Sequence, residues 1–199
     1  MSIPDDDVDG LAPQRMIDWL RSRTPEDWHF VADKLNWDSS KAVIDWILDQ
    51  KSCDKATAAM MFWRSDAAYY LQYPNREAAA AAYGADDFDF IRKLVERWNG
   101  SFYTRSNIAF TPEPSDAYRR YLLEEAKYSA KGIPWQVNAD IGDVRQGEAA
   151  LSDAAYRKRY SDELARLLYA LATDIPHPDR MHGSRGTFVG RLKGLFNLD

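Results

Sequence analysis

Apolar residues repeat along most of the chain with the three-to-four-residue spacing of an amphipathic helix, and the alternation typical of a strand is scarce. One such pattern runs from Asp54 to Leu71 and is apolar on nearly every face. A helix of that kind is buried in the interior of a protein. The sequence therefore predicts an all-α protein, an irregular multi-helix bundle around a buried central helix over residues 54–71.

Capping residues mark where several other helices begin and end. Thr24 and Pro25 provide a capping hydroxyl and a proline for the first helical position, and Glu26 and Asp27 follow in the first turn, where the helix dipole favours negative charge. Gly100 ends a later pattern. The predicted helices follow Pro13, Thr24, Ser39 or Ser40, and Asp54, and continue over 78–82, 86–98, from Ser115 to Ala126, from Ser152 to Leu171 and over 188–196.

The same patterns suggest how the chain is organised. Residues 101–114 are irregular and end in two prolines, which makes them a candidate boundary, and residues 133–147 form a long predicted loop. We expect one compact domain overall. Its predicted parts are an acidic N-terminal tail over 1–12, a helical core over 13–100 and a second helical portion over 115–199 that packs on the core.

Composition supports a globular, cytoplasmic protein. The chain has 199 residues, of which 45% are hydrophobic, so its core is large enough to need neither disulfides nor a structural metal. Cys53 is the only cysteine, which suits a reducing compartment. No segment approaches the roughly 18 apolar residues of a membrane span, and Met1 to Gly10 is acidic, unlike a leader peptide.

The charge of the chain is unevenly distributed. The net charge is −5, and residues 1–55 contain 12 acidic and 7 basic side chains, whereas residues 56–199 contain 19 of each. This balance argues against binding to the phosphate backbone of nucleic acid. Two interpretations of the acidic excess stay open, an acidic face for a basic partner and a solvated tail with polar helix surfaces.

Four short motifs carry a resemblance to a known family. They are Asn36-Trp37-Asp38, Cys53-Asp54-Lys55-Ala56-Thr57-Ala58, Met61-Phe62-Trp63-Arg64 and Tyr69-Tyr70. Over roughly residues 29–73 the chain resembles a bacterial family defined only as a domain of unknown function. Ala56 stands where glycine is more usual in that pattern. The resemblance implies a bacterial, intracellular setting and transfers no catalytic residues.

Two single residues have both a functional and a structural interpretation. Cys53 precedes a predicted helix, and a helix N-terminus lowers the pKa of a thiol, which would suit a nucleophile. No histidine is near it in sequence, so we favour a small apolar residue beneath the helix start. We likewise interpret His29 as a histidine at the edge of the core.

Two segments near the C-terminus contain residue types that bind ligands. The nine residues from 174 to 182 include Asp174, His177, Asp179 and His182, which are ligand types for zinc or manganese and could serve a metal-dependent hydrolase. Their spacing matches no established signature, and a polar linker would look the same.

The adjacent glycine-rich turn offers an anion-binding alternative. Ser184, Arg185 and Thr187 could hold a small anion at the start of the last predicted helix. The turn lacks the lysine and spacing of a P-loop, and an ordinary helix cap would have the same sequence.

No catalytic arrangement stands out along the chain, and we predict no cofactor. We therefore interpret the protein as a non-catalytic protein-binding module, an immunity or antitoxin-like protein that blocks a basic partner through charge and aromatic anchors. We expect a protein partner, no nucleic acid and no membrane span. The candidate partner-binding residues are Trp37, Asp38, Asp45, Asp49, Asp54, Tyr156 and Tyr160.

Overall fold

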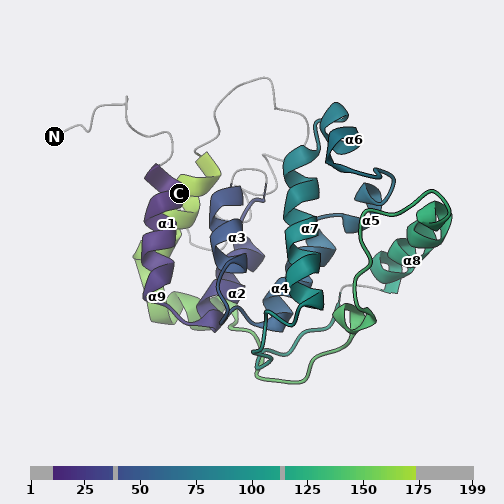
Figure 1. Ribbon diagram of the computed structural model, residues 1–199. Coiled ribbons are helices and arrows are strands. Elements are labelled where there is room, and N and C mark those ends of the chain that lie inside the picture. The colour runs from purple at the N-terminus through teal and green to yellow at the C-terminus, as the bar shows by residue number, and fades with distance from the viewer. Residues whose placement is uncertain (1–10, 38–39, 113–114, 174–199) are drawn as a thin grey trace. The chain divides into compact units, whose positions relative to one another are not determined.

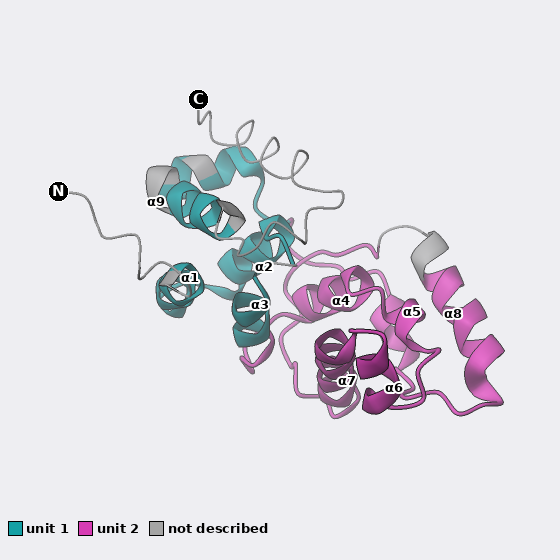
Figure 2. Ribbon diagram, turned by 90° about the horizontal axis from the view of Figure 1, so that it is seen from above, with its two compact units in different colours: residues 1–47, 150–199 teal, residues 48–149 magenta. Residues whose placement is uncertain are grey.

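A computed structural model describes residues 11–37, 40–112 and 115–173, and within these ranges all regular secondary structure is helical (Figure 1). The predicted all-α, multi-helix class is confirmed. The chain divides into two compact units, coloured separately in Figure 2. Unit 1 contains residues 1–47 and 150–199, and unit 2 contains residues 48–149. Residues 101–114, the candidate boundary from the sequence, lie inside unit 2.

The described part of unit 1 contains three N-terminal helices and one helix from the C-terminal part of the chain. They are α1 (Leu11–Arg21), α2 (Pro25–Lys34), α3 (Lys41–Leu48) and α9 (Asp153–Thr173). Helix α1 packs along α9, so segments more than 130 residues apart share one core (Figure 1). That core contains Met16, Leu20, Phe30, Val31, Val43, Ile47, Tyr156, Leu164 and Leu168.

The start of α2 follows its sequence signals closely. Thr24 has extended backbone geometry, Pro25 occupies the first turn, and Glu26 and Asp27 follow. The backbone N–H of Thr24 donates to Asp27 Oδ2 at 2.9 Å, and the Thr24 hydroxyl lies 3.1 Å from the same oxygen. The predicted cap is confirmed, because a carboxylate in the first turn satisfies a donor that the helix leaves unpaired.

Unit 2 contains the most deeply buried helix of the family-like region. Its elements are α4 (Lys55–Arg64), α5 (Ala67–Tyr70), α6 (Arg76–Ala81), α7 (Ala85–Asn99), α8 (Ser115–Ser129) and the 3₁₀ helix η2 (Ala139–Gly142). Helix α4 packs against α5 and α7, α6 packs against α7, and α8 packs against α5. Every residue of α4 from Ala56 to Phe62 is buried.

The single helix predicted over 54–71 is in fact two helices. Helix α4 ends at Arg64, and α5 begins at Ala67 after Asp66, which adopts the left-handed conformation with φ 54° and ψ 42°. The Ser65 hydroxyl donates to the Phe62 carbonyl at 2.8 Å. The Ser65 side chain competes with the helical backbone for a hydrogen bond, and aspartate is one of the few residues besides glycine that adopts the left-handed conformation, so the helix ends at residues 65–66 despite the apolar pattern.

The two long connections of unit 2 pair with each other. Ile108 forms a parallel bridge with Glu148, and Phe110 forms an antiparallel bridge with Arg145. A Cβ atom on Gly147 would lie 2.3 Å from the Asn107 carbonyl oxygen, so only glycine fits at this crossing. The predicted loop over 133–147 is therefore anchored, and it also contains η2.

Candidate functional site

The predicted partner-binding residues divide between the units and differ in exposure. Unit 1 holds Trp37, Asp45, Tyr156 and Tyr160, and unit 2 holds Asp49 and Asp54. Trp37, Asp45 and Tyr160 are partly exposed, Asp49 is exposed, and Asp54 and Tyr156 are buried. Asp38 lies outside the described residues. Tyr156 and Tyr160 lie together, with ring centroids 5.1 Å apart.

Asp54 serves the interior of unit 2. Its carboxylate is 0% exposed and accepts the backbone N–H groups of Ala56 at 2.9 Å and Asn107 at 2.7 Å. The Arg105 Nε atom lies 3.7 Å from Asp54 Oδ2, and the Arg105 carbonyl accepts the N–H of Lys55 at 2.8 Å. The side chain thus caps α4 and ties it to residues 105–107, so we leave Asp54 out of any partner-facing surface.

Asp49 is exposed but engaged by two cations of α7. Lys93 Nζ lies 3.1 Å from Asp49 Oδ1, and Arg97 pairs with the same oxygen. Partial burial by itself would raise the pKa of the Asp49 carboxyl, but the hydrogen bonds and charges of Arg97 and Lys93 outweigh it and hold that pKa below its usual value. The carboxylate is ionised at neutral pH and already paired.

In unit 1, Tyr156 and Tyr160 both donate hydrogen bonds to Asp27, a buried carboxylate that the sequence analysis did not select for function. Asp27 is 0% exposed, and its Oδ1 accepts the hydroxyls of Tyr156 at 2.9 Å and Tyr160 at 3.1 Å. The Tyr156 ring stacks on Phe30 with centroids 3.4 Å apart. Burial, followed by the charge and hydrogen bond of Asp27, raises the pKa of both tyrosines.

Arginine stacking completes this cluster. The Arg23 guanidinium carbon lies 4.5 Å from the Trp19 ring centroid and 4.9 Å from that of Tyr160. Trp19 and Tyr160 also meet edge to face at 5.3 Å. Cation–π and edge-to-face contacts of this kind stabilise packing between helices. These contacts therefore hold α9 against α1 and α2. Tyr156 is 2% exposed and is unavailable to a partner.

Cys53 and His29 are interior residues. The Cys53 thiol is 0% exposed, and burial, reinforced by the charge of Asp54, raises its pKa. A thiol in that environment stays protonated and is a poor nucleophile. His29 is 6% exposed within α2. Both placements agree with the structural interpretations made from the sequence.

The two ligand-binding hypotheses near the C-terminus fall outside the described residues. They are the metal site at Asp174, His177, Asp179 and His182 and the anion site at Ser184, Arg185 and Thr187. Within residues 11–37, 40–112 and 115–173, no group of three or more histidine, cysteine, aspartate or glutamate side chains is placed to hold a metal ion. No helix in those ranges is long and apolar enough to cross a bilayer.

The acidic excess of residues 1–55 also falls outside the described residues. The described part of this segment contains seven acidic and seven basic side chains. The five remaining carboxylates are Asp5, Asp6, Asp7, Asp9 and Asp38. Two of the seven described acidic side chains, Asp27 and Asp54, are buried, so the described surface of this segment has no acidic excess.

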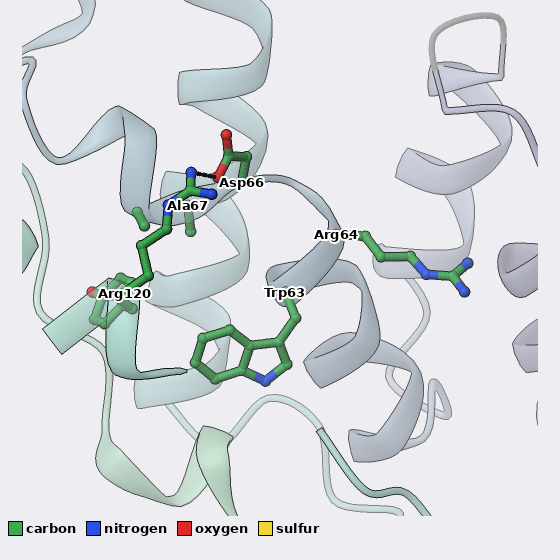
Figure 3. Close-up of a pocket in the computed structure, with 7 residues that line it drawn as sticks. Trp63, Arg64, Asp66, Ala67 and Arg120 are labelled. Atoms are coloured by element: carbon green, nitrogen blue, oxygen red, sulfur yellow. Dashed lines mark hydrogen bonds and ion pairs between the residues drawn. The ribbon is translucent and has the colours of Figure 1, made fainter. Parts of the chain in front are cut away.

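A small pocket opens in unit 2 where α4, α5 and α8 meet (Figure 3). Its volume is about 110 Å³, and its lining residues are Trp63, Arg64, Asp66, Ala67, Ala68, Arg120 and Tyr121. Ala67, Ala68 and Tyr121 are buried, and the Trp63 indole N–H donates to the Ile141 carbonyl at 3.3 Å. Figure 3 shows Asp66 and Arg120 paired at the rim and the Arg64 guanidinium pointing away. The pocket has an apolar floor and one ion pair at its mouth.

Beside this pocket, unit 2 carries a group of tyrosines that we call the tyrosine cluster, made of Tyr69, Tyr73 and Tyr128. The hydroxyls of Tyr69 and Tyr73 are 2.9 Å apart, their ring centroids are 5.7 Å apart, and Tyr128 of α8 lies near Tyr73. Tyr69 is 47% exposed. Tyr70 lies below, with its hydroxyl donating to Asp87 at 2.9 Å.

Helix α8 adds apolar surface to the same unit. Leu122 is 44% exposed and Leu123 is 62% exposed. The sequence analysis predicted a helix over these residues and did not select the tyrosine cluster. Two signals were available in the sequence. Tyr69 and Tyr73 are four residues apart, the spacing of neighbours on one helix face. Leu122 and Leu123 are adjacent, so they cannot both face the core of one helix.

Comparison with known proteins agrees with the family resemblance. Residues 23–99 match a family model described as a domain of unknown function, DUF4274. The match confirms the resemblance found over roughly residues 29–73 and extends it at both ends. No curated protein and no solved structure matches the chain.

Proposed function

We propose that the protein is a non-catalytic protein-binding module that blocks a basic partner, as an immunity or antitoxin-like protein does. The observation that carries the proposal is the tyrosine cluster, with the exposed leucines of α8 in the same unit. Tyrosine is enriched at interfaces because it offers a large, rigid apolar ring with a polar tip, and a few such residues dominate binding energy.

The charge of the chain supports a basic partner. The net charge is −5, and four carboxylates gather at Asp5, Asp6, Asp7 and Asp9. Charges of one sign that meet the opposite sign on a partner accelerate association, even where they add little to final affinity. In this proposal the acidic segment attracts the partner, and the tyrosine cluster holds it.

The first experiment identifies the partner and then tests the cluster directly. The tagged chain is used to capture proteins from its native host at moderate salt, and a stoichiometric partner is purified and titrated by calorimetry. We expect Tyr69→Ala and Tyr73→Ala each to weaken binding by about tenfold or more, the effect of removing an anchor residue. Tyr83→Ala is the matched control, because Tyr83 is 100% exposed and outside the cluster.

Electrostatic attraction has a separate readout. Replacing Asp5, Asp6, Asp7 and Asp9 by asparagine should lower the association rate and leave the dissociation rate nearly unchanged. The association rate of the unmodified chain should fall as salt screens the charges. An acidic partner, or cluster variants that bind as the Tyr83 control does, would contradict the proposal.

A further inference from the structure

The pocket beside Trp63 has the size and lining of a receptor for one aliphatic side chain. Its volume is about 110 Å³, and an apolar cavity of about 150 Å³ in another protein accommodates benzene. Trp63, Ala67 and Tyr121 supply apolar surface, and the Trp63 and Tyr121 rings meet edge to face at 6.2 Å. A branched aliphatic group would therefore fill most of the space.

The polar rim is not explained by stability. Asp66 is 55% exposed and Arg120 is 57% exposed, and exposed ion pairs contribute little to folding. Asp66 also occupies the left-handed region, with φ 54°, where glycine is favoured. Its side chain makes no capping hydrogen bond to α5. A carboxylate is thus held at a position where glycine would suit the backbone better.

We propose that this pocket binds the C-terminal residue of a partner chain, an aliphatic residue with a free carboxylate. The aliphatic side chain packs against the Trp63 and Tyr121 rings that line the pocket, the backbone N–H of that residue donates to Asp66, and its carboxylate binds Arg120. A guanidinium presents five donors in a planar fork, so Arg120 can pair with Asp66 and with a second carboxylate. Figure 3 shows both rim groups on the same side of the Trp63 indole.

This inference rests on the proposed function, because it names the part of a partner that one pocket in unit 2 recognises. The Asp66 and Arg120 pair at the pocket mouth recognises a single residue of the partner, whereas the acidic segment Asp5 to Asp9 attracts the partner as a whole. Asp66 matches an N–H donor and Arg120 matches a carboxylate, and a chain terminus presents both groups on one residue next to its side chain. An internal segment of a partner lacks the terminal carboxylate.

The test uses the full chain and a small probe with the chemistry of a C-terminal leucine. N-acetyl-L-leucine is titrated into ¹⁵N-labelled protein to about 20 mM, because isolated contacts of this size bind in the millimolar range. We expect saturable shifts of the Trp63 indole N–H and the Ala67 and Ala68 amides. N-acetyl-L-leucinamide, which lacks the carboxylate, should bind about tenfold more weakly.

Variants assign the effect to the rim. Arg120→Gln should abolish the difference between acid and amide, and Arg119→Gln, an exposed neighbour on α8 that does not line the pocket, should leave it unchanged. Asp66→Gly should lower affinity for both probes without lowering the melting temperature, because glycine relieves the left-handed strain. A purely structural Asp66 would instead lose stability.

Three outcomes would overturn the inference. They are the absence of saturable shifts, equal binding of acid and amide, and an acid preference that survives Arg120→Gln. Failure of the proposed function is seen separately, since it would appear as unchanged partner affinity in the Tyr69 and Tyr73 variants and would not alter the probe titration.

Discussion

Among the residues that the structure describes, each unit contains one fully buried carboxylate at the start of a helix, and the two are satisfied in different ways. Asp54 in unit 2 accepts two backbone N–H groups and lies near Arg105. Asp27 in unit 1 accepts a backbone N–H from Thr24 and the hydroxyls of Tyr156 and Tyr160. One carboxylate organises nearby backbone, and the other recruits a helix about 130 residues away.

In both units, residues outside the family match supply partners for buried polar side chains inside it. Asp27 and Asp54 both lie within residues 23–99, but Tyr156, Arg105 and Asn107 do not. Trp98 is a further example, because it lies within the match and its indole N–H donates at 2.8 Å to Asp140 Oδ1, which lies outside it. The matched segment supplies the buried acceptors, and later segments supply most of their partners.

Removing the later segments should therefore have the largest effect. A chain ending at residue 99 would leave Asp27, Asp54 and Trp98 without these partners, and an unpartnered buried polar group costs about 1–3 kcal/mol each, and more when it is charged. We expect no cooperative unfolding transition by circular dichroism and poor dispersion in the NMR spectrum. A cooperative transition in the truncated chain would show that residues 1–99 fold without the later segments.

Removing each buried carboxylate separately compares the two units. Asp54→Ala should cost about 3–5 kcal/mol, because it leaves the backbone N–H groups of Ala56 and Asn107 without their acceptor and removes the charge near Arg105. Asp27→Ala should cost less, about 2–3 kcal/mol, because the partly exposed Tyr160 hydroxyl can turn to water. Asp18, 59% exposed, provides the control Asp18→Ala, which should change stability by about 0.5 kcal/mol or less.

The measurement must report on each unit alone. Trp19, Trp28, Trp37 and Trp46 lie in unit 1, and the other three tryptophans lie in unit 2. Urea titrations of 5-fluorotryptophan-labelled protein followed by ¹⁹F NMR therefore report the unfolding of each unit separately. Equal losses in both units from either substitution would contradict separate organisation by the two carboxylates.

The two tyrosine hydroxyls on Asp27 should differ in importance. Tyr156 is 2% exposed, so Tyr156→Phe leaves a buried acceptor weakened and should cost about 1–3 kcal/mol. Tyr160 is partly exposed, and Tyr160→Phe should cost about 0.5–1.5 kcal/mol. Urea unfolding of the two variants measures which substitution loses more stability. A larger loss from Tyr160→Phe would show that Tyr160, and not Tyr156, is the more important partner of Asp27.

Alkaline pH should weaken unit 1 through the same tyrosines. Burial and Asp27 raise the pKa of Tyr156 in the folded state above its unfolded value of about 10. The contribution of Tyr156 is therefore complete below pH 10, and it falls by about 1.4 kcal/mol per pH unit as pH rises above 10. Unfolding at pH 8 and pH 11 measures this loss, and Tyr156→Phe should make the unit 1 signal less sensitive to pH.

The smallest effect should come from the exposed carboxylate of unit 2. Asp49 pairs with Lys93 and Arg97 at the surface, so Asp49→Asn should cost about 0.2–1 kcal/mol at low salt and less at high salt. Its lowered pKa means that the contribution is present above the unfolded pKa of about 3.9 and is lost as pH falls through the folded value. Unfolding titrations at two salt concentrations test this contrast with Asp54, whose carboxylate is 0% exposed and should respond less to salt.

Local signals in the sequence were sufficient for the helices and their caps. The Thr24 cap, the Asp54 cap and the buried α4 helix all follow from residue types within one or two turns. The break at Ser65 and Asp66 was missed, because the apolar pattern continues across it, and turn chemistry decides there. The family resemblance was also readable from short motifs.

The candidate site was less accessible to sequence reasoning. Asp49, Asp54 and Tyr156 looked like surface groups for a partner, but each is engaged inside its own unit. The tyrosine cluster and the Trp63 pocket involve α8, whose residues are about 50 positions away in the chain. Nothing in the local pattern places those segments together.

The sequence by itself determined that the described chain is helical, where most of those helices begin, and which family its middle part resembles, because these properties depend on neighbours within a few residues. Only the tertiary structure decided which carboxylates are buried and which aromatic rings stay at the surface. Those outcomes depend on contacts between distant segments, such as Asp27 with Tyr156 and Trp63 with Tyr121, and a linear pattern does not encode which distant faces meet.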